Sequence, residues 1–210
     1  MLQRTPSVLP RLLDRVRAYA GFLGAFVRAH RTIGAIAPTS RGVARRMGVL
    51  GGVGRARSIA ELGAGTGAIT RELLALLPAE GALHAYEVYP PFIEQLRASV
   101  RDPRFTLVAE SAEALPAASS TPGAGGFDAV VSSLPFSLMG PELTHAILRA
   151  SGEALRPGGV FVALQYHPTY LLPFLRQHFG SVERHFNLLN LPPVLLLRAR
   201  DPLPTPASRV

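Results

Sequence analysis

The chain has 210 residues, no cysteine, and a hydrophobic fraction of 48%. This length suits one domain with an appendage, the composition argues against general disorder, and the missing cysteine excludes a disulfide scaffold, a Cys-ligated zinc site and a thiol nucleophile. No apolar run reaches the roughly 18 residues of a membrane span, and charges between residues 11 and 17 interrupt any signal-peptide apolar region. We therefore expect a cytoplasmic protein.

The net charge of +8 is placed unevenly along the chain. All 22 basic residues are arginine, and eleven of them lie in residues 1–60, where Asp14 is the only acidic residue. The rest of the chain is slightly acidic. The basic segment predicts an anionic partner, either lipid headgroups or nucleic acid.

Residues 8–31 read as an amphipathic helix. Apolar residues recur there at helical spacing, and most arginines lie away from that stripe; the stripe comprises Leu9, Leu12, Leu13, Val16, Ala20, Leu23 and Val27. Such a helix can pack on its own domain, act as a lid, pair two subunits, or lie in a membrane interface among anionic headgroups. The oligomeric state stays open.

A shorter helix is predicted over 38–48, with Thr39 or Ser40 as its N-cap. From about residue 56, strands alternate with helices, which predicts a parallel sheet covered on both faces. The expected strands are 56–62, 82–87, 104–109, 127–133 and 159–166, and the expected helices are 67–78, 90–100, 111–115, 141–155 and 171–179.

Two strand-like runs close the pattern, at 181–187 and 193–199. The short link between them predicts an antiparallel hairpin at one side of the sheet. The result is an α/β fold with a mostly parallel seven-stranded sheet. We divide the chain into a basic helical extension (1–54), a cofactor-binding domain (55–200) and a short tail (201–210).

Residues 58–67, Ser-Ile-Ala-Glu-Leu-Gly-Ala-Gly-Thr-Gly, predict a cofactor site. A strand runs into three glycines, Gly63, Gly65 and Gly67, and a helix follows. Glycine permits a positive φ and lets the backbone approach a ligand closely. Taken alone, the motif also fits a dinucleotide fingerprint, so NAD and S-adenosylmethionine both remain possible.

Acidic residues near the motif favour S-adenosylmethionine. Glu61 stands where a dinucleotide site prefers a small apolar residue, and its carboxylate suits the amino group of a methionine. Glu87 ends the next strand, where it would accept from ribose hydroxyls. Glu110 and Ser111 follow the third strand, where an adenine amine could be held. All of them are expected at the carboxyl edge of the sheet.

The Glu-Leu-Gly-Ala-Gly-Thr-Gly motif resembles the first motif of class I S-adenosylmethionine-dependent methyltransferases, which share a Rossmann-like fold. The resemblance implies a set of cofactor-binding residues: Thr39, Ser40, Glu61, Gly63, Gly65, Thr66, Gly67, Glu87, Glu110, Ser111, Ser133 and Leu134.

Three further segments, 34–41, 132–135 and 190–193, are similar to the bacterial phospholipid N-methyltransferases. The resemblance covers roughly residues 30–200. It implies a peripheral membrane enzyme that methylates a phospholipid or aminolipid headgroup such as phosphatidylethanolamine. The acceptor would enter beside Ser132-Ser133-Leu134-Pro135-Phe136.

The related rRNA adenine dimethyltransferases carry Asn-Leu-Pro-Tyr at this place, where the amide holds the target amine and the ring stacks on the flipped base. Ser133 has no carboxamide oxygen, and only residues 201–210 follow the hairpin, so a helical RNA-binding domain is not expected. Nucleic acid is therefore the weaker partner. An RNA methyltransferase, a small-molecule methyltransferase and an NAD-dependent oxidoreductase remain as alternatives.

Methyl transfer requires an amine with a free lone pair, held in line with the donor. Tyr166 and His167, just past the fifth strand, are candidate catalytic residues, together with Ser133 and Phe136. An aromatic face can also stabilise an ammonium. The remaining histidines show no metal-ligand spacing, so we expect no metal. Asp128 is expected to orient a loop.

Overall fold

The computed structural model describes residues 39–117, 125–187 and 193–204. The predicted helix at 8–31 and most of the link at 190–193 lie outside these residues. The expected role of the N-terminal helix at a membrane therefore stays a prediction from the sequence.

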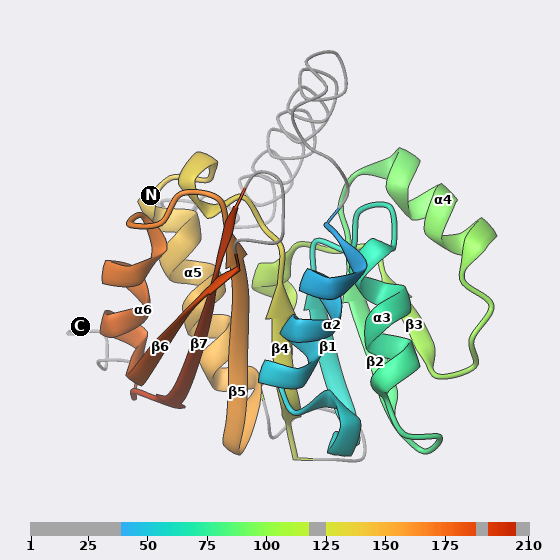
Figure 1. The fold of residues 1–210 in the computed structure, drawn as a ribbon, viewed down its shortest axis with the longest axis horizontal. Helices are drawn as coiled ribbons and strands as arrows, with labels where there is room; N and C mark the ends of the chain where they lie inside the picture. The colour runs from blue at the N-terminus through green and yellow to red at the C-terminus, as the bar shows by residue number, and fades with distance from the viewer. Residues whose placement is uncertain (1–38, 118–124, 188–192, 205–210) are drawn as a thin grey trace, which may run out of the picture.

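The described residues form an α/β fold with seven strands (Figure 1). The strands are β1 (Ser58–Leu62), β2 (Ala82–Tyr86), β3 (Phe105–Val108), β4 (Phe127–Ser132), β5 (Leu155–Gln165), β6 (Phe179–Asn187) and β7 (Val194–Pro202). The helices are α2 (Arg41–Leu50), α3 (Ala68–Leu76), α4 (Pro90–Ser99), α5 (Pro141–Ala154) and α6 (Leu171–His178), with 3-10 turns η1 (Val53–Arg55), η2 (Ala112–Ala114) and η4 (Phe136–Leu138). The predicted fold class is confirmed, although the helix expected at 111–115 is a single 3-10 turn.

The strand order is β3-β2-β1-β4-β5-β7-β6. Strands β1 to β5 run parallel, and β7 runs antiparallel to both β5 and β6, as the short link predicted. The order reverses between β1 and β4. Open α/β sheets bind ligands at such a switch point, outside the carboxyl ends of the strands.

Three hydrophobic clusters hold the described helices against the sheet. On one face, α2 and α3 pack through residues such as Met47 and Leu73 against β1, β4, β5 and β7, and α4 packs on β2 through Leu96. On the other face, α5 and α6 pack through Leu148 and Leu175. The central strand β1 is buried along its whole length, which fits a parallel sheet that is covered on both faces.

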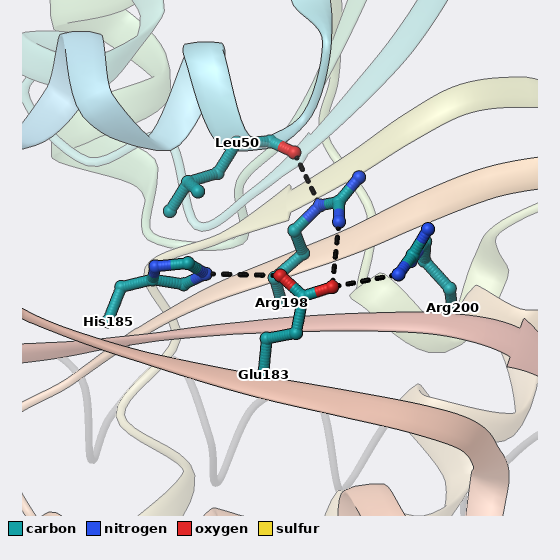
Figure 2. Close-up of polar contacts among 5 residues, drawn as sticks. All are labelled: Leu50, Glu183, His185, Arg198 and Arg200. Atoms are coloured by element: carbon teal, nitrogen blue, oxygen red, sulfur yellow. Dashed lines mark hydrogen bonds and ion pairs between the residues drawn. The ribbon is translucent and has the colours of Figure 1, made fainter.

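A polar network joins the C-terminal hairpin to α2 (Figure 2). Arg198 donates from Nε to the carbonyl oxygen of Leu50 at 2.9 Å and from Nη1 to Glu183 Oε1 at 2.9 Å. Arg200 Nη2 donates to the same carboxylate oxygen at 2.8 Å, and His185 Nε2 lies 3.3 Å from Glu183 Oε2. The cation at Arg198 meets the negative end of the α2 dipole, which fixes α2 on the sheet.

Asp128 has the orienting role expected of it. Its Oδ2 atom accepts from the backbone N–H groups of Arg57 and Ser58 at 2.7 and 2.9 Å, and its carboxylate pairs with Arg156. These contacts fix the entry to β1 at the edge of the sheet opposite the glycine turn. Among the described residues, no helix combines the length and the hydropathy needed to cross a bilayer.

Candidate active site

The glycine turn after β1 has the backbone that the sequence predicts. Gly63, Gly65 and Gly67 have φ angles of 77°, 55° and 80°, a region that favours glycine. A Cβ at Gly63 would lie 2.9 Å from the side chain of Leu134. The turn therefore needs glycine for its conformation and also for the close approach of the loop after β4.

Glu87 ends β2 and turns its carboxylate back onto the glycine turn. Its Oε2 accepts from the N–H of Gly65 at 2.8 Å, and its Oε1 accepts from those of Val88 and Tyr89 at 2.8 and 2.9 Å. Burial raises the pKa of Glu87, while these three backbone bonds act in the opposite direction. Oε1 already accepts two bonds, so the lone-pair capacity left for a hydroxyl donor is on Oε2.

Glu61 is buried in β1, directly below the turn. Its Oε2 accepts a hydrogen bond from the hydroxyl of Thr70, in α3, at 2.7 Å. Its Oε1 is buried and has no hydrogen-bond partner. Burial raises the pKa of Glu61 to about 7, and the nearby charge of Glu87 adds to this, whereas the bond from Thr70 lowers it. A buried carboxylate oxygen without a partner requires a donor or a cation.

A pocket opens where β1, β2, β3 and β4 end. Five of its lining residues are among those expected from the sequence: Gly63, Glu87, Glu110, Ser111 and Leu134. The other five, Tyr86, Val88, Ala112, Met139 and Ile147, were not singled out. Tyr86 and Val88 flank Glu87 and could have been found from it. Met139 and Ile147 come several residues after β4 in the sequence, and no motif there identifies them as lining a site.

Two residues at this edge form local contacts. Ser111 caps η2, since its Oγ accepts from the N–H of Glu113 at 3.5 Å, and it also donates to the Glu113 carboxylate at 3.3 Å. Ser133 Oγ donates to the carbonyl oxygen of Gly63 at 2.7 Å. Ser133 therefore ties the loop after β4 to the glycine turn, while its lone pairs remain available to a donor.

The entry to α2 meets the end of β5. Ser40 is the N-cap of α2 and accepts from the N–H of Val43 at 3.4 Å. Thr39 instead forms a hydrogen bond with the side chain of Tyr166. Burial raises the pKa of Tyr166 despite this bond, so the phenol stays neutral at physiological pH. A residue expected at the cofactor and a residue expected at the acceptor thus contact each other.

The other candidate catalytic residues differ in their exposure. His167 is exposed in the loop after β5, where its Nδ1 lies 3.4 Å from the hydroxyl of Thr169 and its ring lies 6.4 Å from that of Tyr170. Phe136 is fully buried in the core beside α5 and α6. Its position supports a packing role, so we leave Phe136 out of the group that would contact an acceptor.

Gln165, the last residue of β5, was missed by the sequence reasoning. Its buried amide donates from Nε2 to the carbonyl oxygens of Leu164 at 2.6 Å and Leu134 at 3.4 Å. It therefore supports the loop that carries Ser133. No local motif marks this residue, because its partner is 31 positions away in the sequence.

Three of the other described histidines, His84, His145 and His178, serve packing and pairing. His145 Nδ1 lies 2.9 Å from His178 Nε2, between α5 and α6, and the ring of His84 packs edge-on against Phe127. In residues 39–117, 125–187 and 193–204, no group of three or more His, Cys, Asp or Glu residues is placed to hold a metal ion.

The site fits S-adenosylmethionine on two observations. The unpartnered Oε1 of Glu61 is a buried acceptor suited to a positively charged amino group. The pocket at the ends of β1 to β4 is lined by Gly63, Glu87, Glu110 and Ser111, so a nucleoside bound there would lie beside the Glu87 carboxylate. When bound, this cofactor supplies an electrophilic methyl group on a sulfonium.

Comparison with known proteins identifies relatives of the chain. A model described as a methyltransferase domain matches residues 59–159. An ornithine lipid N-methyltransferase from Singulisphaera acidiphila is 30% identical over 173 residues, which cover 82% of this chain and 90% of that protein.

Solved structures share the fold. The 1,6-didemethyltoxoflavin N1-methyltransferase of Burkholderia thailandensis is similar with a TM-score of 0.65 and 17% identity, over 95% of this chain and 93% of that one. The N-methyltransferase NodS of Bradyrhizobium japonicum is similar with a TM-score of 0.61 and 19% identity, over 78% of this chain and 96% of that one. At these identities the likeness concerns the fold alone.

Proposed function

Because the chain belongs to the class I S-adenosylmethionine-dependent methyltransferases, we propose that it methylates a nitrogen of a lipid headgroup at a membrane surface. The observation that carries this proposal is the relative named an ornithine lipid N-methyltransferase, which aligns with most of both chains. Family membership decides between the two cofactors left open by the glycine motif, in favour of S-adenosylmethionine. The acceptor is the part that we propose.

The cofactor roles follow from the site. Glu87, at the end of β2, would accept from a ribose hydroxyl through Oε2, while the pocket beside Glu110 and Ser111 would take the adenine. Glu61 would hold the amino group through its free Oε1. Thr66 and Ser40 border the same turn and the entry to α2, where the methionine end would lie. These residues position the donor, and positioning supplies much of the acceleration in a displacement reaction.

The acceptor amine is proposed to lie between the loop after β4 and the end of β5. Ser133, with its hydrogen donated to Gly63, can accept from an N–H of the amine. The neutral Tyr166 phenol is fixed by Thr39 and can do the same. His167, which follows Tyr166 directly, carries an imidazole that is proposed to take up the proton of the amine. The amine must lose that proton before its lone pair can attack.

Membrane contact by the basic N-terminal segment remains part of the proposal. Residues 1–60 carry eleven arginines and one acidic residue, and each basic residue near an anionic surface contributes about 1 kcal/mol of attraction. A headgroup amine cannot leave the bilayer without exposing its acyl chains to water, which is unfavourable. The enzyme must therefore bring its active site to the membrane.

A methyl-transfer assay with radiolabelled S-adenosylmethionine tests the proposed acceptor. Vesicles that contain ornithine lipid, vesicles that contain phosphatidylethanolamine, and ribosomal RNA are offered in parallel to the full chain. We expect label in one of the two lipids. Label in RNA alone, or in neither lipid while a soluble amine is methylated, would overturn the lipid acceptor. Binding of S-adenosylhomocysteine, measured by calorimetry, verifies that the protein is folded.

A further inference from the structure

Three large apolar side chains are exposed at the carboxyl edge of the sheet, beside the proposed acceptor site. Leu138 in η4 is 44% exposed, Tyr166 after β5 is 40% exposed, and Phe186 near the end of β6 is 64% exposed. We call these three residues the apolar rim. We propose that the apolar rim inserts into the membrane interface and sets the active site at headgroup depth; this inference rests on the proposed lipid acceptor.

The topology places the rim on one edge. Strands β4 and β5 are parallel, and β6 runs in the direction of β5 because both are antiparallel to β7. The residues that follow β4 and β5, and the last residues of β6, therefore all lie at the carboxyl edge, at the upper end of the sheet in Figure 1. The glycine turn and the cofactor pocket lie at the same edge. The rim thus lies at the same edge of the sheet as the site that it would serve.

The charges around the rim fit an anionic lipid surface. Arg184 is exposed on the same face of β6 as Phe186, one pleat further from the edge. Arg41 begins α2 beside Thr39; its side chain is 95% exposed, and its Nε forms a 3.8 Å ion pair with Glu72 Oε1, of a kind that contributes little at an exposed position. Arginines set back from an apolar tip lie at phosphate level when the tip enters the interface. Glu142 lies in the first turn of α5, the helix that follows η4, so we assign the main contribution to apolar contact.

The opposite edge of the sheet offers a matched control. Val49, near the end of α2, is 64% exposed, and Leu203, after β7, is 46% exposed. Gly51, which follows α2, lies against Ala129 near the start of β4, and β7 ends beside the start of β6. These two residues are as exposed as the rim but face away from the cofactor site, so only their position distinguishes them from the rim.

The cysteine-free chain permits a direct test. Single variants of the full chain, Leu138→Cys, Phe186→Cys, Val49→Cys and Leu203→Cys, are labelled with a polarity-sensitive fluorophore. They are then mixed with vesicles of phosphatidylcholine and phosphatidylglycerol. We expect a blue shift, with quenching by brominated lipids, at positions 138 and 186 and no change at 49 and 203. An equal response at all four positions, or no response at 138 and 186, would overturn the proposal.

Double variants measure the contribution of the rim. Leu138→Ser with Phe186→Ser should weaken vesicle binding roughly tenfold, because interfacial affinity scales with buried apolar area. Val49→Ser with Leu203→Ser should leave it unchanged, and both variants should bind S-adenosylhomocysteine as the parent does. Unchanged vesicle binding by Leu138→Ser with Phe186→Ser would refute the proposal. The proposal would also be refuted if the parent protein forms a dimer and these substitutions dissociate it. Rim-dependent vesicle binding without methylation of any lipid supports the rim and refutes only the lipid acceptor.

Discussion

The hydroxyl of Ser133 donates a 2.7 Å hydrogen bond to the carbonyl oxygen of Gly63, 70 residues earlier in the chain. This bond joins the glycine turn that receives the cofactor to the loop that borders the proposed acceptor site. The side chain of Leu134 packs against the same glycine. The parts of the chain proposed to hold the two substrates therefore contact each other directly, and we expect a change in one loop to affect the other.

We expect Ser133→Ala to weaken the binding of S-adenosylhomocysteine about three- to tenfold. The variant loses a hydrogen bond whose net contribution is typically about 1 kcal/mol, and the glycine turn loses a support. Calorimetry measures the change. Ser137→Ala removes an exposed hydroxyl from η4 and should have no effect. Equal affinities of Ser133→Ala and the parent protein would show that the bond does not order the turn.

The raised pKa of Glu61 predicts two opposite dependences on pH. Burial raises this pKa from 4.5 to about 7, so between these values the folded protein retains a proton that the unfolded chain has lost. The stability of the unliganded protein should therefore fall as the pH rises through this window, by about 3 kcal/mol at most. Affinity for S-adenosylhomocysteine should rise over the same window, because the ionised Glu61 attracts the ligand amino group.

Glu61→Gln tests both dependences. The variant cannot ionise at this position, so the decline of thermal stability between about pH 4.5 and 7 should flatten, and so should the rise in ligand affinity. Glu80→Gln, at an exposed position, should preserve both profiles. Identical profiles for Glu61→Gln and the parent protein would exclude Glu61 as the titrating group.

Tyr166→Phe should lower turnover roughly tenfold, since a hydroxyl at the reacting centre is lost, while cofactor affinity is retained. His167→Ala should act in the same direction. Thr39→Val removes the partner of Tyr166 and should reproduce part of the loss. A double-mutant cycle between positions 39 and 166 reports their coupling. Wild-type turnover in Tyr166→Phe and His167→Ala would remove both residues from the mechanism.

Gln165→Met should reduce turnover more than cofactor affinity. The buried amide supports the carbonyl oxygens of Leu134 and Leu164, and a thioether of similar size cannot donate to either. We expect kcat to fall several-fold and thermal stability to fall by about 1 kcal/mol. Gln177→Met makes the same change at an exposed position of α6 and should be neutral. A loss of cofactor affinity equal to the loss of turnover would contradict a role confined to the acceptor loop.

Glu183→Gln should destabilise the hairpin. Although partial burial alone raises the pKa of Glu183, the charges of Arg198 and Arg200 and the bond from His185 hold it below its ordinary value. Its contribution is therefore present above about pH 4.5 and is lost as the pH falls further. The side chain is partly exposed, so we expect Tm to fall by only about 2–4 °C at neutral pH. Glu94→Gln serves as the exposed control. The Tm values of the parent and of Glu183→Gln should differ at pH 7 and converge at pH 3, and equal Tm values at pH 7 would argue against the network.

Much of the fold follows from local patterns. The alternation of apolar runs with helical spacing predicted all seven strands, and the short link predicted the antiparallel hairpin. Strand ends were less predictable: β5 begins at Leu155, not at 159, because it pairs with Phe127 across a register shift in β4. That pairing depends on a neighbouring strand and leaves no mark in the local sequence.

Local sequence patterns favoured S-adenosylmethionine over NAD, and family membership decided between the two cofactors. The glycine turn, Glu61 and Glu87 lie within 27 residues, and their chemistry follows from residue type and from position at the strand ends. The tertiary structure alone decided which residues share the side of the proposed acceptor site. It buried Phe136 in the core, joined Thr39 to Tyr166, and placed Gln165 against Leu134. Such contacts depend on strand order and register, which bring together residues that are far apart in the chain. Neither helical nor strand periodicity in the sequence links these residues.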